Sequence, residues 1–426
     1  MAGLFSRRHF AGSLLAGSSA LALPRRAWAA GSVRWMWWGN PERDRRTNAV
    51  IKAYKAQNPD LAITGESANW GDYWPKLATQ VAGRRAPDVI QMDYRFLVEY
   101  ARRGALLPLE QVMPQPLDLT GFDPAETDGG KVAGKVYGAS VGANAYAVHC
   151  NVDAFARAGV ALPGPGWSWA DFEQAATALS KAGPQGFYGA ADASRSEDIL
   201  ERWLQQRKKM FFTEDGQIGF TPDDIAAYFA FWGGLRKKGI VTPAELTATD
   251  HAELRTSMLT TGKAAIGFHH SNQLAGVQAL MKDRVALADI PAQQRNGATG
   301  NYLKPSQLMS ISAKSTNVKE AAALIRFVLA DPEAVRIQGI ERGVPDSQAL
   351  RDMMAPSLGP EDAAIALFVS QVSKTAGPTP PAPPKGGGEM NTLLPRIADQ
   401  VAFGQITEVE GGRALVENLA NLLKRA

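Results

Sequence analysis

Cysteine is almost missing from this sequence of 426 residues, in which Cys150 is the single example. That scarcity excludes an intrachain disulfide, a zinc site built on several cysteines and an iron–sulfur cluster. Long apolar runs are missing too, since the run that ends near Leu23 is too short to cross a bilayer. The chain also lacks the H-E-x-x-H motif, the P-loop and the G-x-G-x-x-G motif, and we predict no cofactor or bound metal. What is present is 45% hydrophobic and 21% charged, enough for a large core and more than one domain.

Residues 1–29 have the pattern of an export signal peptide. Arg7 and Arg8 precede the short apolar run, and Ala27-Trp28-Ala29 offers a small-residue cleavage site. The paired arginines resemble a twin-arginine signal, and Arg25-Arg26 beside the cleavage site suits that route. An ordinary secretory signal with a chance arginine pair is the alternative. We expect a soluble periplasmic protein, and Cys150 lies too far from the cleavage site to carry a lipid anchor.

The basic character of the whole chain comes from this signal. Its four arginines leave with it and no acidic residue does, so Lys+Arg falls from 46 to 42 against 42 Asp+Glu. The formal charge of +4 then becomes zero. A balanced chain offers no basic surface for a nucleic acid, and we predict no nucleic-acid partner.

Three strand–helix units follow the signal at a spacing close to thirty residues, which is typical of a parallel sheet with crossover helices. The strands are predicted at 33–38, 61–66 and 87–92, each followed by an amphipathic helix. From 138 to 151 small residues give way to alternation, which indicates extended chain. Further helices are predicted at 167–179, 199–209, 221–239, in two segments after 312, and within 391–425; further strands are predicted at 262–270 and 307–312.

Local catalytic patterns are weak. Gly138-Ala139-Ser140-Val141-Gly142 matches the G-x-S-x-G elbow, but that elbow must join a strand to a helix, and alternating strand-like sequence follows here. His269 and His270 are neighbours on a predicted strand, so they should point to opposite faces and cannot share one metal ion. A pair of carboxylates for glycoside hydrolysis remains open, because their separation is a property of the folded chain.

Aromatic residues beside planar polar ones end each of the three strands. In open α/β sheets a ligand crevice lies beyond the carboxyl ends of the strands. A pyranose suits such a place, because its apolar faces stack on indole or phenol rings while its hydroxyls bond amides, carboxylates and guanidinium groups. We expect Trp35 to be core and Trp38 to face the crevice. The candidates at these strand ends are Trp37, Trp38, Asn40, Arg43, Glu66, Trp70, Asp93 and Tyr94.

The ordered set of "WMWWGNPERDRR", "PDVIQMDYRF", "YGASVGANAYAVHCN", "WSWADF", "GKAAIGFHHSN", "GVPDS" and "GGGEMN" resembles the maltose-binding-protein-like extracellular sugar-binding proteins of ABC importers. The resemblance covers nearly the whole chain after the signal. It implies an α/β fold of two lobes, each a mostly parallel sheet flanked by helices, with the ligand cleft between them. The lobes would be 30–142 with 303–345, and 143–302 with 346–426.

The resemblance also implies roles for particular residues. Asn40, Asp93 and Tyr94 would bond ligand from the first lobe, and Asn144 would face it where the chain crosses. His270 and Asn272 match a second-lobe position that can hold an aromatic stacking residue, so histidines there are a departure. Glu389, in the glycine-rich loop, is a further candidate contact.

The function implied is capture of a sugar or oligosaccharide by hinge closure and delivery to a membrane permease, by a monomeric protein that is not an enzyme. The glycine-rich segment "GASVGAN" would absorb the rotation. Two alternatives stay open: an exported glycoside hydrolase or lyase whose carboxylates include Glu66 and Asp93, and a binder of another solute, such as a peptide, polyamine or metal complex, since aromatic boxes also hold cations.

Overall fold

The computed structural model describes residues 31–122 and 127–425. The predicted signal peptide, residues 1–29, lies outside these ranges. None of the helices that the structure describes combines the length and the apolar character that crossing a membrane requires.

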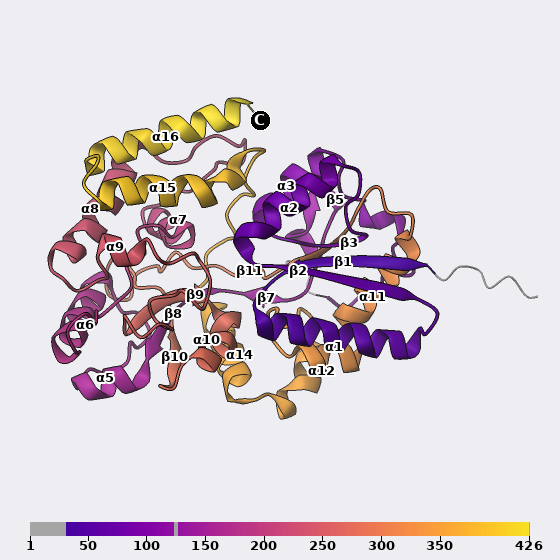
Figure 1. The fold of residues 1–426 in the computed structure, drawn as a ribbon, viewed down its shortest axis with the longest axis horizontal. Helices are drawn as coiled ribbons and strands as arrows, with labels where there is room; N and C mark the ends of the chain where they lie inside the picture. Colours follow the sequence, from indigo (N-terminus) through magenta and orange to yellow (C-terminus); the bar gives the residue numbers. More distant parts are fainter. Residues whose placement is uncertain (1–30, 123–126, 426) are drawn as a thin grey trace, which may run out of the picture. The chain divides into compact units, whose positions relative to one another are not determined.

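The first sheet has five strands in the order β2-β1-β3-β12-β6. Its strands β1, β2 and β3 are labelled in Figure 1. Strand β1 is parallel to β2 and to β3, whereas β12 is antiparallel to both β3 and β6. The three predicted strand–helix units are confirmed, with bounds shifted by a few residues. The elements are β1 (Ser32–Trp38), α1 (Pro41–Gln57), β2 (Ala62–Ala68), α2 (Trp70–Ala82), β3 (Val89–Met92), α3 (Tyr94–Arg102), β6 (Ala139–Ser140) and β12 (Leu308–Ile311).

Alternation along β1 divides its large side chains between the two faces of this sheet. Trp35 and Trp37 enter the core shared with α1 and α11 (Val318–Ala330), and Trp35 is fully buried as predicted. Met36 and Trp38 point to the opposite face and pack with residues of α2 and α3. A strand that is buried on both faces reads as a continuous apolar run, which explains "VRWMWW".

The second sheet has the strand order β10-β8-β9, formed by β8 (Tyr146–Asn151), β9 (Ile266–His270) and β10 (Val285–Ala288). All of its strand pairs are antiparallel, so the prediction of a mostly parallel sheet in each lobe is wrong for this one. Apolar periodicity shows that a segment is a strand, but it does not encode the direction of the neighbouring strand. Single parallel bridges, such as Ala190 with Val241, lie outside the named strands.

Helices cover this second sheet. Predicted helices at 167–179, 199–209 and 221–239 are confirmed as α6 (Trp169–Ala182), α7 (Glu197–Gln205) and α8 (Pro222–Lys237). Ser168 and Thr221 begin α6 and α8 with capping boxes. Helix α16 packs along α8 and α15 (Figure 1). Others are α5 (Val152–Ala158), α9 (Ala244–Thr247), α10 (Leu274–Leu280), α14 (Pro360–Val372), α15 (Met390–Ala402) and α16 (Glu408–Arg425).

Two short strands lie in sequence between the two sheets. Strand β7 (Ala143–Asn144) pairs antiparallel with β11 (Lys304–Pro305), so that Asn144 stands opposite Lys304. The segment from 138 to 151 is therefore extended, as predicted, and Ser140 does not sit on a strand-to-helix turn. The remaining elements are β4 (Lys131–Val132), β5 (Lys135–Val136), α12 (Pro332–Gln338) and α13 (Gln348–Met354).

Candidate functional site

Five aromatic rings from β1, α2 and α3 pack together on the face of the first sheet that α2 and α3 cover; we call Trp38, Trp70, Tyr73, Trp74 and Phe96 the aromatic cluster. The ring centroids of Trp38 and Trp70 are 5.2 Å apart, and those of Trp74 and Phe96 are stacked at 3.8 Å. Trp38 is 8% exposed because its neighbours cover it. The expected open stacking face on Trp38 is therefore wrong for this structure, while Trp70 at the edge of the cluster stays partly exposed.

The polar residues that follow these strands begin the next helices. The side chains of Asn40, Asn69 and Asp93 accept hydrogen bonds from backbone N–H groups in the first turns of α1, α2 and α3, each at 2.9 Å. An N-cap position requires a short polar side chain just after the strand, which is also where a ligand-binding side chain would lie. One acceptor oxygen of Asn40 and one of Asp93 are therefore occupied by the fold itself.

Two predicted contacts belong to the interior instead. Trp37 is 2% exposed, and its indole N–H donates to Asp44 at 2.7 Å. Arg43 forms a buried ion pair with Glu341, 2.9 Å from Nε to the carboxylate, and donates to the carbonyl of Trp38 at 3.1 Å. Both predictions are corrected, because alternation on β1 turns Trp37 into the core, and the guanidinium of Arg43 at the end of β1 is already bonded within the fold.

Of three other candidates, Glu66 and Tyr94 are hydrogen-bonded within the fold, and Glu389 is exposed. Glu66 is held by Arg34 and Gln80 along the edge strand β2. Tyr94 donates its hydroxyl proton to the carbonyl of Pro380 at 3.0 Å, and burial raises its pKa to about 12. Glu389 is exposed at the end of a short 3-10 helix, and the adjoining Gly388 packs so closely on Phe96 that an added Cβ would lie 2.6 Å from that ring.

Asn144 and Asn272, which the resemblance implied as ligand contacts, bond each other in this structure. The amide of Asn144 donates to the Oδ1 of Asn272 at 2.7 Å, and Asn272 donates in turn to the carbonyl of Glu341 at 2.6 Å. Ser271 also donates to Asn144, at 2.5 Å. This buried network ties the β7 strand to the segments that follow β9 and α12.

A group of charged side chains lies between the ends of α3 and α7; we call Asp93, Arg95, Glu197, Asp198, Glu201, Arg202 and Lys304 the charge cluster. Arg95 is its centre, with its guanidinium 2.9 Å from Asp198, 3.6 Å from Glu197 and 3.9 Å from Asp93. The same guanidinium lies 5.8 Å from the ring of Trp70, so the charge cluster and the aromatic cluster adjoin.

Aromatic rings also line the second-sheet side of the charge cluster. The Arg202 guanidinium lies over Tyr146 at 5.2 Å and over Tyr302 at 4.6 Å. Tyr302 donates to Glu201 at 2.5 Å. His270 packs edge-on against Tyr146 at 5.0 Å between ring centroids. His269 points to the other face of β9, toward His149 and Ser257, which confirms that the two histidines diverge.

Burial and neighbouring charges set the protonation of these groups. Burial raises the pKa of Glu197 to about 7, against the attraction of Arg95. The pKa of Asp198 is lowered, because the charges of Arg95 and Lys304 outweigh its burial. Burial holds the pKa of His270 well below its usual value, so its ring is neutral at physiological pH. Among the described residues, no three His, Cys, Asp or Glu side chains are grouped so that they could hold a metal ion.

Sequence reasoning missed most of the charge cluster. Arg95 follows the predicted contacts Asp93 and Tyr94, yet it was given no role. Helix 199–209 was predicted, but its acidic first turn, Glu197-Asp198 after the N-cap Ser196, was not read as part of a site. An acidic first turn is ordinary at a helix N-terminus, so only the packing of α7 near α3 distinguishes it.

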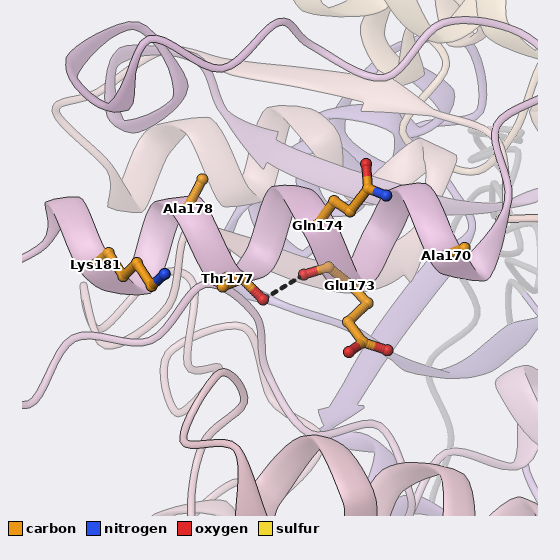
Figure 2. Close-up of a pocket in the computed structure, with 6 residues that line it drawn as sticks. All are labelled: Ala170, Glu173, Gln174, Thr177, Ala178 and Lys181. Atoms are coloured by element: carbon orange, nitrogen blue, oxygen red, sulfur yellow. Dashed lines mark hydrogen bonds between the residues drawn. The ribbon is translucent and has the colours of Figure 1, made fainter.

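A surface pocket lies elsewhere, along α6 (Figure 2). Figure 2 shows Glu173 and Lys181 on this helix, with Thr177 donating to the carbonyl of Glu173 at 2.7 Å. The pocket contains none of the predicted site residues. Its lining comes from a single helix, so it does not mark the candidate site.

Comparison with known proteins gives a consistent answer. The family profile described as bacterial extracellular solute-binding protein matches residues 49–344. A protein of Brucella abortus described as a binding protein is 30% identical over 168 residues, 38% of this chain and 39% of that relative. In that match the chain thus spans about two fifths of the relative's length.

Solved structures extend the likeness over the whole described chain. An extracellular solute-binding protein from Alicyclobacillus acidocaldarius is 28% identical, with TM-score 0.67 over 93% of this chain and 99% of its own. An oligogalacturonide-binding protein from Yersinia enterocolitica, solved with digalacturonic acid, is 21% identical, with TM-score 0.82 over 93% and 99%. These structures show that the chain has the two-lobed α/β fold of periplasmic binding proteins.

Proposed function

Because the chain belongs to the family of bacterial extracellular solute-binding proteins, we propose that its solute is a sugar or oligosaccharide, which it passes to the permease of an ABC importer. The observation that carries the proposal is the aromatic cluster beside the charge cluster. Trp70 and Arg95 stand 5.8 Å apart, ring centroid to guanidinium carbon. An indole face next to a fixed polar group suits a pyranose, which has apolar faces and a hydroxyl rim.

We propose that binding closes two lobes about the segments β7 and β11. The lobes would be 30–142 with 303–345, and 143–302 with 346–426. The pairing of the two sheets supports this division, since the described strands of each sheet fall on one side of it. A ligand would favour the closed form by its greater affinity for that form.

Ligand contact is proposed for the predicted residues that keep an exposed part and lie beside the clusters, namely Trp70, Tyr94 and His270. The unoccupied polar atoms of Asn40 and Asp93 would add hydrogen bonds at the strand ends. Glu66 and Asp93 are engaged with Arg34 and with the first turn of α3, which removes support from a hydrolase that would use them.

The remaining parts of the proposal concern the cellular setting. The chain would act as a monomer, without enzymatic activity and without nucleic acid. The family is extracellular by description, which agrees with an exported protein. The signal peptide and the twin-arginine route rest on residues 1–29 alone.

A thermal-shift screen of mono- and oligosaccharides tests the function. A ligand at a hundred times its dissociation constant adds about 2.7 kcal/mol to the free energy of unfolding, which raises the melting temperature by several degrees. The bound sugar should be recovered chemically intact, since a binder does not turn it over. Small-angle scattering should then show a smaller radius of gyration with the sugar. Consumption of the sugar would favour the enzyme, and an unchanged radius would refute hinge closure.

A further inference from the structure

Lys304 has fewer hydrogen-bond and ion-pair partners than any other residue of the charge cluster. It lies on β11, opposite Asn144, and is 3% exposed. Among the described residues its ammonium takes part in no hydrogen bond and no ion pair, although its charge acts on Glu197, Asp198 and His270. An ammonium has three donors, which leaves those of Lys304 available to a ligand.

An unsatisfied acceptor lies in the same cluster. The Oε2 atom of Glu197 is buried and has no hydrogen-bond donor, although the Arg95 guanidinium is 3.6 Å away. The Glu197 side chain is 11% exposed. A buried carboxylate oxygen without a donor is costly. The charge cluster therefore offers a ligand both the donors of Lys304 and the acceptor oxygen of Glu197.

The charges of the charge cluster indicate which kind of ligand fits both Lys304 and Glu197. Three cations, Arg95, Arg202 and Lys304, face four carboxylates, Asp93, Glu197, Asp198 and Glu201, while His270 is neutral. A ligand carboxylate would add a further negative charge to a cluster in which the carboxylates already match or outnumber the cations. A hydroxyl adds none, and it both accepts a hydrogen bond from an ammonium and donates one to a carboxylate.

We infer that Lys304 and Glu197 form a hydroxyl-binding pair, and that the solute of this protein is an uncharged saccharide rather than a sugar acid. The inference rests on the proposed function and adds to it the charge class of the sugar. Neighbouring ring hydroxyls of a neutral pyranose would accept from Lys304 and donate to Glu197. A uronic acid would place its carboxylate among Asp198, Glu201 and Glu197.

The test of charge class is a paired screen on the full mature chain. Glucose, galactose and mannose and their short oligomers are compared with glucuronic acid, galacturonic acid and oligogalacturonides, first by thermal shift and then by calorimetry. A neutral sugar should bind, with its uronic counterpart at least about tenfold weaker. Tighter binding of a uronic acid overturns this inference and leaves the proposed function standing. If no saccharide of either class binds, the proposed function itself fails.

The test of the pair is Lys304→Met, with Lys314→Met, at an exposed lysine, as the matched control. Affinity for the neutral sugar should fall about 10- to 150-fold, the effect of one hydrogen bond to a charged group, while K314M binds normally. A fall in melting temperature with unchanged affinity shows a purely structural lysine. If K304M does not fold, Glu197→Gln, which weakens the acceptor, should lower affinity in its place, and normal affinity there overturns the pair.

Discussion

Acid should destabilise this protein through a histidine outside the candidate site. His269 lies on β9, with its Nε2 3.0 Å from the hydroxyl of Ser257 and its ring 5.2 Å from that of His149. Burial lowers the pKa of His269 from 6.5 to about 4. His149 is fully buried with neither ring nitrogen bonded, and burial holds its pKa well below the usual value. Both rings are therefore neutral in the folded protein.

Proton binding determines the direction in which the free energy of unfolding changes with pH. Between pH 6.5 and about 4 the unfolded chain protonates His269 and the folded chain does not, so the unfolded state is stabilised relative to the folded state as the pH falls. The contribution of His269 to stability is fully present above pH 6.5 and is lost progressively as the pH falls to about 4. A difference of about 2.5 pH units corresponds to at most about 3 kcal/mol for this one partly exposed side chain.

Urea unfolding of the wild type and of His269→Gln, measured at steps from pH 7 to pH 4, isolates this contribution. Glutamine keeps a polar partner for Ser257 but does not titrate, while carboxylate titrations are common to both proteins. At pH 7 the free energy of unfolding of H269Q should be equal to or lower than that of the wild type. Between pH 7 and pH 4 it should increase relative to the wild type by about 2 to 3 kcal/mol. A difference between the two proteins that stays constant over this range refutes the reasoning.

Two further predictions concern packing and buried charge. Gly388→Ala, whose Cβ would lie 2.6 Å from the Phe96 ring, should cost about 1 to 3 kcal/mol of unfolding free energy, whereas Gly164→Ala, with no atom within 4 Å, should change it by less than about 0.5 kcal/mol; equal effects in urea unfolding would contradict the close contact. Arg43→Met should cost about 3 to 5 kcal/mol by leaving Glu341 buried and unpaired, and Arg43→Met combined with Glu341→Leu should restore most of it. Additive losses in the double variant would show that the pair is not coupled.

The fold could be predicted from the sequence to a large extent, because each unit carries its own local signals. Apolar periodicity located β1, β2 and β3 and the helices after them, and alternation placed Trp35 in the core. Strand direction in the second sheet was beyond such signals, because it depends on which segments pair after long connections.

The candidate site was only partly within reach of the sequence. Asn40 and Asp93 were found, but a polar residue after a strand has the same pattern whether it caps the next helix or binds a ligand. The tertiary structure decided between these uses by showing the backbone N–H groups that occupy them.

The sequence by itself determined the class of the chain, the order of its elements, and the crowding of aromatic rings at the ends of the first strands. Tertiary structure alone decided that Arg95, Glu197 and Lys304 share one cluster, since they come from α3, α7 and β11. Hydrophobic periodicity and helix capping depend on residues only a few positions apart, so the local sequence reveals them. Desolvation and charge pairing depend on residues about a hundred positions apart, whose distance is fixed only when the chain has folded.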